Sequence, residues 1–194
     1  MNIPKSTGEI FEILSKGQFI CSNSSETRIL KLYNIIEDED NYDLLYDYFL
    51  NINFVLEKGD EYYYFSRHNE SRADMERKLE SAMRWIDIVD FLKTLDSSFG
   101  PGYSFSPSQA AVKISVDAFL QNKADGIRNI LRIDENVPYK DLVAKVAELL
   151  CRDGFMESEN EILNTYKVLS SFKFLEELID NINIPEEIKD EIPE

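Results

Sequence analysis

The sequence predicts an α+β fold that is mainly α-helical with small β-hairpins. Two observations support this class: apolar residues recur every three or four positions in most segments, and alternating strand-like runs occur only in short stretches. The chain has 194 residues, of which 43% are hydrophobic and 12% aromatic. At roughly 150 residues per domain, this length allows one or two domains, and two small domains fit comfortably.

The first elements are two helices with a short strand between them. Ser6 and Glu9 have the spacing of a capping box, and the apolar positions that follow predict a short helix that Gly17 ends. Residues 19–20 predict a short strand. A polar run then supplies turn and N-cap residues for a second helix over residues 29–36.

A third helix and a hairpin complete the N-terminal part. An acidic cluster at residues 37–40 ends the second helix, and the apolar spacing of residues 42–50 predicts the third. Residues 54–56 and 62–65 predict two strands, with turn residues at 58–60. Three compact helices followed by a hairpin is the element order of a winged helix.

A long helix connects this part to the rest of the chain. Residues 72–95 contain no Gly or Pro and carry a wide apolar stripe, which suits a connector or a dimer-forming element. Residues 96–106, which include Gly100 and Gly102, predict a loop. Ser106 and the following Pro107 then open a helix that is expected to end near Asn122.

The second half repeats the order of the first. Pro138 opens a helix that Gly154 closes, strands follow at residues 155–157 and 162–168, and a last helix begins at Phe172. The sequence therefore predicts tandem winged-helix domains joined by a long helix. The expected divisions are an N-terminal winged helix (1–70), connecting or dimerisation helices (71–122), a C-terminal winged helix (123–183) and a flexible acidic tail (184–194).

Motifs for catalysis are missing from the sequence. None of the seven glycines begins a Walker A loop, and Gly100 and Gly102 lack the remaining features of a dinucleotide-binding turn. The acidic residues at 37–43 lack the spacing and glycine of a calcium loop. The single histidine, His68, follows a hairpin and reads as an exposed loop residue. We therefore expect no catalytic residue, no metal site and no cofactor.

The compartment follows from the cysteines and the N-terminus. Cys21 and Cys151 lie in apolar surroundings without the spacing of a metal site, which favours a reducing compartment. The N-terminus does not resemble a signal peptide, and apolar runs are too short to cross a membrane. We expect a soluble cytoplasmic protein without membrane contact.

The formal net charge of −16 argues against a protein that coats nucleic acid. Bases concentrate near the first hairpin, where they either form a phosphate-contacting patch or, as is more common, a salt-bridged helix face. The expected third helix carries Asp43 and Asp47 and no Arg or Lys, which argues against reading of the major groove. The candidate DNA contacts are Arg67, Arg72, Arg77, Lys78, Arg128, Arg132, Lys140, Lys145 and Arg152.

The tyrosines of the expected third helix favour contacts with proteins over contacts with DNA. Positions 46 and 48 are about 200 degrees apart on a helix, so at least one of Tyr42, Tyr46 and Tyr48 is expected to be exposed, either as part of an interface or as an incidental surface aromatic. The acidic tail is either solvated or a docking peptide. In the second case its partner-binding residues are Ile184, Ile188 and Ile192, which recur every four positions.

Several short segments carry a resemblance to a known family. They are residues 13–20 (ILSKGQFI), 46–49 (YDYF), 61–65 (EYYYF), 153–155 (DGF) and 166–168 (YKV). On these segments the chain resembles the MukE/MksE family, the small winged-helix subunit of bacterial condensin-like SMC complexes. The resemblance spans most of the chain.

The resemblance implies a non-catalytic subunit that works with other proteins. Such a subunit forms a homodimer and binds a kleisin, which bridges the heads of an SMC-type ATPase in chromosome organisation or plasmid defence. It implies a nucleoid-associated location, and the charge of −16 limits DNA contact to the assembled complex.

Two other functions remain open from the sequence. A dimeric winged-helix transcription regulator would bind duplex DNA alone with steep salt dependence. A hydrolase with an unrecognised carboxylate site would require a pocket holding an acid with a strongly raised pKa.

Overall fold

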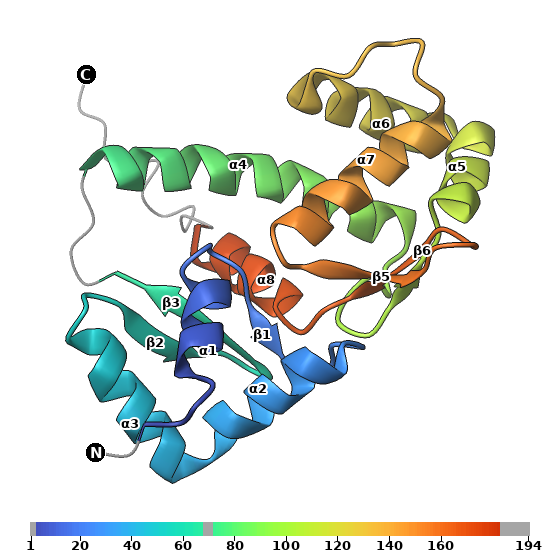
Figure 1. Cartoon of the computed structure of the whole chain (residues 1–194). Coiled ribbons are helices and arrows are strands. Elements are labelled where there is room, and N and C mark those ends of the chain that lie inside the picture. Colours follow the sequence, from blue (N-terminus) through green and yellow to red (C-terminus); the bar gives the residue numbers. More distant parts are fainter. Residues whose placement is uncertain (1–2, 68–71, 183–194) are drawn as a thin grey trace, which may run out of the picture.

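Two small antiparallel sheets, each packed with its own helices, divide the chain (Figure 1). This computed structural model describes residues 3–67 and 72–182, and within them the chain forms eight helices and two three-stranded sheets. The expected α+β class is confirmed.

The N-terminal unit contains three helices and the first sheet. Its strands lie in the order β1-β3-β2, with Ile20 opposite Tyr63 and Leu56 opposite Phe65. The bounds in chain order are α1 (Thr7–Leu14), β1 (Ile20–Cys21), α2 (Thr27–Glu37), α3 (Glu39–Leu50), β2 (Val55–Lys58) and β3 (Tyr62–Ser66). All the elements expected in this region are present.

The ends of these helices follow from local chemistry, with one correction. The expected capping box does not form, because the Ser6 side chain caps nothing and the Glu9 carboxylate instead pairs with the Arg28 guanidinium. Asp38 caps α3 by accepting a hydrogen bond from the Asn41 N–H at 3.1 Å. Gly17 follows α1 at φ +78°, a conformation that glycine adopts without strain.

Helix α4 (Arg72–Leu95) runs without interruption and has the expected bounds. It extends over the N-terminal unit at one end and contacts α5, α6 and α8 at the other (Figure 1). Its apolar stripe is buried at Trp85, Ile88 and Leu92. A stripe this wide packs against more than one neighbour, as the sequence indicated.

The C-terminal unit contains the second sheet and the remaining helices. Its strands lie in the order β4-β6-β5, which is the topology of the first sheet: a lone strand pairs with the second strand of a hairpin. The bounds are β4 (Ser104–Phe105), α5 (Pro107–Val116), α6 (Ala118–Leu131), α7 (Tyr139–Arg152), β5 (Met156–Asn160), β6 (Thr165–Val168) and α8 (Phe172–Ile182).

Three expectations for the C-terminal half are wrong. The supposed loop at residues 96–106 contains β4. The helix opened by Pro107 ends at Val116, because Asp117 has an extended backbone and its carboxylate accepts from the N–H groups at the start of α6. Ile162 lies in the β5–β6 turn and not in a strand.

Each unit has its own hydrophobic core. The C-terminal core is the larger and joins α4 to α5, α6, α7 and α8. The N-terminal core gathers residues from α1, α2, α3, β2 and β3. A third, small cluster of Cys21, Tyr62 and Leu169 lies between the units, so the two cores are linked through buried side chains.

Candidate partner-binding surfaces

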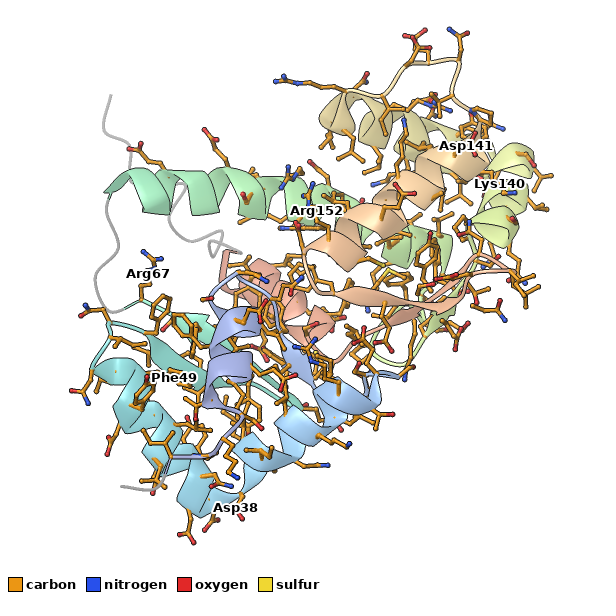
Figure 2. All side chains as sticks on the ribbon, in the orientation of Figure 1. Asp38, Phe49, Arg67, Lys140, Asp141 and Arg152 are labelled. Atoms are coloured by element: carbon orange, nitrogen blue, oxygen red, sulfur yellow. The ribbon has the colours of Figure 1, made fainter. Side chains whose placement is uncertain are left out.

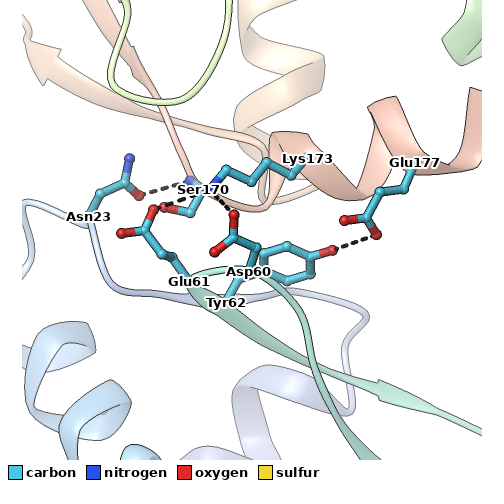
Figure 3. Close-up of polar contacts among 7 residues, drawn as sticks. All are labelled: Asn23, Asp60, Glu61, Tyr62, Ser170, Lys173 and Glu177. Atoms are coloured by element: carbon cyan, nitrogen blue, oxygen red, sulfur yellow. Dashed lines mark hydrogen bonds and ion pairs between the residues drawn. The ribbon is translucent and has the colours of Figure 1, made fainter.

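The contact between the two units, here called the joint, involves the loop after β1 and the start of α8 (Figure 3). The Asn23 Nδ2 donates to the Val168 carbonyl at 3.1 Å, and its Oδ1 accepts from the Ser170 N–H at 2.8 Å. The Glu157 carboxylate accepts from the Ser24 hydroxyl at 2.8 Å. These bonds join residues more than 130 positions apart and fix the units to each other.

The turn of the first hairpin belongs to the same joint. The Lys173 Nζ lies 2.6 Å from an Asp60 oxygen and 3.3 Å from a Glu61 oxygen, and the Tyr62 hydroxyl donates to Glu177 at 3.4 Å (Figure 3). The hydrogen bond to Asp60 raises the pKa of Lys173, and burial raises the pKa of Tyr62. The tip of the β2–β3 hairpin is therefore part of the joint.

Helix α3 carries the three tyrosines predicted to bind a partner. Tyr42 and Tyr46 are half-buried, and the Tyr42 hydroxyl donates to the Leu56 carbonyl at 3.1 Å. Tyr48 is 41% exposed, so the expected exposed member of the set is Tyr48. Leu50 and Ile52 are exposed as well, which leaves three large apolar side chains within five residues at the end of α3. We call Tyr48, Leu50 and Ile52 the α3 surface.

An ion network joins the end of α2 to strands β2 and β3. The Tyr63 hydroxyl donates to Glu37 at 2.5 Å, and the Lys58 ammonium lies 2.8 Å from the same carboxylate. The hydrogen bond from Lys58, followed by that from Tyr63, holds the pKa of Glu37 below its usual range. Burial raises the pKa of Tyr63. Lys58 is thus paired with Glu37 of the same unit, although its side chain is exposed.

The predicted DNA contacts are scattered over the molecule (Figure 2). Arg128 is only 6% exposed, and its guanidinium bonds the Asp134 carbonyl at 3.1 Å, which removes it from the candidates. Arg152 pairs with Asp153 at 2.8 Å. Arg132, Lys140 and Lys145 are exposed, and Lys140 lies next to Asp141.

The candidates around α4 can be placed only in part. Arg67 lies with its guanidinium 5.3 Å from the centre of the Phe54 ring. The backbone of Arg72, Arg77 and Lys78 lies in the first half of α4, and their side chains fall outside the described part of the chain. No continuous basic face is built from the candidates whose side chains are described.

Among the described residues, the carboxylates with a resolved pKa shift are Glu12, Glu37, Asp96 and Asp134, and the pKa of each is lowered. Within residues 3–67 and 72–182, no three His, Cys, Asp or Glu side chains gather to hold a metal. His68 lies outside these ranges. No helix in them is long and apolar enough for a membrane span.

An open groove of about 680 Å³ runs between the N-terminal unit, α4 and α8. Phe54 and Phe65 line it from the first sheet, Trp85 from α4, and Leu175 and Leu178 from α8. The wall is mainly apolar, with Arg67 and Ser81 among its polar residues. The lining residues come from positions 14–17, 54, 65–67, 81–85, 155 and 174–178, and no local pattern in the sequence predicts the groove.

Comparison with known families gives one match over most of the chain. Residues 5–179 match the family described as condensin complex protein MksE. A search of curated proteins gives no match. The matched range contains both sheets, α4 and nearly all of α8. The chain belongs to the MksE family of condensin complex proteins.

Proposed function

We propose that this chain is a non-catalytic accessory subunit of a bacterial condensin-like SMC complex that binds the kleisin subunit as a homodimer. The family match over residues 5–179 is the observation that carries the proposal. The kleisin connects the subunit to an SMC-type ATPase, which supplies the nucleotide chemistry. The complex serves chromosome organisation and segregation or plasmid defence, in the cytoplasm at the nucleoid.

Tandem winged helices are the architecture proposed for this role. In support, each unit has the order helix, strand, helices, hairpin, and each sheet has the lone strand beside the second hairpin strand. Residues 1–70 form the first module and 184–194 the tail. Because β4 pairs with β6 and α4 packs on α6 and α8, we propose that the second module begins with α4 as its first helix.

The kleisin contact is assigned to the α3 surface. Tyr48, Leu50 and Ile52 are each 41% exposed at the end of α3, and exposed aromatic and apolar side chains are typical of protein interfaces. The Tyr42 ring packs against the rings of Tyr46 and Tyr63, and Tyr42 and Tyr46 remain proposed partner contacts beside this surface. The predicted tail contacts Ile184, Ile188 and Ile192 lie outside the described residues and remain proposals.

Dimerisation needs a second surface. Val112, Val116 and Phe119 are all exposed where α5 meets α6, and Val112 and Val116 are one helical turn apart. This apolar cluster lies in the C-terminal unit, while the α3 surface lies in the N-terminal unit. Separate surfaces allow a homodimer and a kleisin contact to coexist.

DNA contact is proposed only within the assembled complex. The net charge of −16 opposes binding by the isolated chain. Helix α3, which would enter the major groove in a DNA-reading winged helix, holds acidic residues and no Lys or Arg. A transcription regulator would need the opposite charge there.

Titration of a purified kleisin fragment into the full chain tests the kleisin contact. We expect Tyr48→Ala together with Leu50→Ser to weaken binding about tenfold or more, as removal of an interface anchor does. Phe119→Ser is the matched control, because it removes an exposed apolar side chain from the other surface. It should lower the dimer fraction in sedimentation and leave kleisin affinity unchanged. Kleisin binding unaffected by the α3 substitutions would contradict the assignment.

A further inference from the structure

The turn of the β5–β6 hairpin is apolar, exposed and held in a defined shape. Ile162 is 95% exposed and Leu163 is 66% exposed. The Asn160 Oδ1 accepts a hydrogen bond from the Leu163 N–H at 3.0 Å, and Asn164 has a left-handed backbone at φ +50°. This local turn chemistry holds both apolar side chains away from the protein. We call Ile162 and Leu163 the hairpin tip.

A second exposed apolar cluster lies on the same side of the C-terminal unit. It consists of Val112, Val116 and Phe119, and we call it the α5–α6 cluster. Helix α5 and the β5–β6 turn both lie at the right-hand edge of the molecule in Figure 1. The Ser104 hydroxyl donates to the Glu159 carboxylate, which ties the hairpin to the segment just before α5. Because α5 packs against α4, α6 and α7, its exposed face points outward at this edge.

We propose that the hairpin tip of each protomer packs on the α5–α6 cluster of the other protomer in a symmetric pair. The inference rests on the homodimer proposed above and assigns the element that meets this cluster. In a two-fold pair, a contact between two different patches forms twice, once in each direction. The pair closes when both patches lie on one side of the protomer, whereas patches on opposite sides join copies into an open chain. The shared edge therefore favours a closed pair.

The first hairpin shows how such a turn docks. Its turn carries Asp60 and Glu61, which both contact Lys173 on α8, and Tyr62 is buried beside them. The second hairpin holds the same place in its sheet but reaches no helix of its own chain with its tip, as the exposure of Ile162 shows within the described residues. A helix that presents lysine beside an apolar surface would fit this second turn.

The α5–α6 cluster offers that combination on a second copy. Glu159 and Glu161 flank the hairpin tip, and the rest of the turn carries no base. Lys113 follows the first valine of the cluster, and the Lys123 ammonium lies 5.7 Å from the centre of the Phe119 ring. Each ammonium also pairs with an aspartate of its own chain, so we expect these charges to orient the contact more than to strengthen it.

The size of a stable interface also favours use of both patches. Stable protein interfaces bury about 800 Å² on each partner. The three side chains of the α5–α6 cluster fall short of this area. The hairpin tip adds two large apolar side chains to the share of each protomer, with the polar residues of the turn as a rim.

Cross-linking between two differently tagged full chains tests the contact. One preparation carries Ile162→Cys and the other Val116→Cys, and they are mixed before a short bis-maleimide is added. We expect a covalent dimer that contains one chain of each kind. Ile162→Cys mixed with Met83→Cys is the matched control, because Met83 is 56% exposed on α4 and belongs to neither patch. That mixture should give no more mixed dimer than the unchanged chains give.

Sedimentation equilibrium of the full chain measures the strength of the contact. Ile162→Ser together with Leu163→Ser should raise the dissociation constant of the dimer about tenfold or more, because each dimer loses the tip contact twice. Met83→Ser should leave the dissociation constant unchanged. Both tip residues are exposed in the single chain, so the far-UV spectrum of the double variant should match that of the original chain.

The outcomes separate this inference from the homodimer on which it rests. Mixed adducts above the control, together with a dimer weakened by the tip substitutions, support the contact. A dimer unaffected by these substitutions, or mixed adducts no more frequent than in the control, would overturn the contact and leave the homodimer standing. A full chain that stays monomeric at every concentration would overturn both. An unchanged dimer with weakened binding of a kleisin fragment would assign the tip to kleisin and also overturn the contact.

Discussion

The two hairpins hold the same place in their sheets, but only the turn of the first hairpin contacts the other unit. The turn of the β2–β3 hairpin is tied to α8 through Lys173, which contacts both Asp60 and Glu61. The turn of the β5–β6 hairpin projects from the molecule, with Ile162 95% exposed. Equal topology therefore does not give equal availability for partners. The first hairpin holds the units together, and the second remains accessible.

The hydrophobic cores of the two units also differ, in the number of side chains that each core buries. Phe11, Phe49, Phe54 and Phe65 form an aromatic cluster in the N-terminal unit, with ring centres 4.8 to 6.1 Å apart. The C-terminal core contains aromatic rings as well, among them Phe99, Phe105 and Phe172, but it buries many more apolar side chains than the N-terminal core does. A small core that depends on a few large rings should be more sensitive to the loss of one ring.

The largest expected effect is the loss of such a ring. Phe49→Ala should lower the free energy of unfolding by about 3–5 kcal/mol, because Phe49 is fully buried and contacts Phe11 and Phe65. Urea titration followed by circular dichroism measures it. Measured for the monomeric chain, Ile162→Ala, at a residue that is 95% exposed, should change the same quantity by less than about 0.5 kcal/mol. Similar losses for both variants would contradict the role given to Phe49 in the N-terminal core.

The turn of the first hairpin should tolerate little change. A Cβ at Gly59 would lie 2.1 Å from the Tyr62 ring, so Gly59→Ala must displace a side chain that belongs to the joint. We expect a loss of about 1–3 kcal/mol in thermal or urea unfolding. Gly126→Ala is the control, because nothing lies near that Cβ and alanine favours helix α6. A Gly59→Ala protein as stable as the original would show that this turn is not fixed by packing.

A polar contact of the joint should have a smaller effect. Asn23→Ala leaves the buried Ser170 N–H without its acceptor, whereas the Val168 carbonyl keeps the hydrogen bond from the Gly102 N–H. The expected loss is about 1–2 kcal/mol. Hydrogen exchange should show faster exchange at Ser170 than at residues of the C-terminal core. Unchanged exchange at Ser170 would mean that the joint does not depend on Asn23.

The smallest expected effect is on the pH dependence of stability. The pKa of Glu37 is lowered in the folded state by Lys58 and Tyr63, so its stabilising contribution is present at neutral pH. That contribution is lost as the pH falls through the lowered pKa, because the unfolded state then binds the proton more readily. Glu37→Gln should flatten the decline of the unfolding free energy below about pH 5. A decline as steep as in the original chain would exclude this contribution.

Elements with strong local signals were predictable from the sequence. Helix α4 has the expected bounds because residues 72–95 contain no breaker. Strand β4 was missed because its two residues become a strand only through pairing with β6. The break at Asp117 is not predictable because apolar residues continue on both sides of it; its extended backbone and the hydrogen bonds that its carboxylate accepts identify it as the N-cap of α6.

The candidate surfaces also divide into features that local sequence predicts and features that arise only from tertiary contacts. Helical geometry predicted that one of three tyrosines is exposed, and Tyr48 is that residue. The joint was not predictable, because Asn23 and Ser170 meet only after both units have folded. Arg128 shows the converse, since its charge indicated a surface role, but packing against Tyr139 and bonding to Asp134 bury it.

Parallel binding titrations test the central claim most directly, using one preparation of the full chain against a kleisin fragment and against duplex DNA at several salt concentrations. A subunit that acts through protein contacts should bind the kleisin fragment and show little affinity for DNA alone. Tight DNA binding that weakens steeply with added salt, together with no kleisin binding, would contradict the account and identify a DNA-binding regulator.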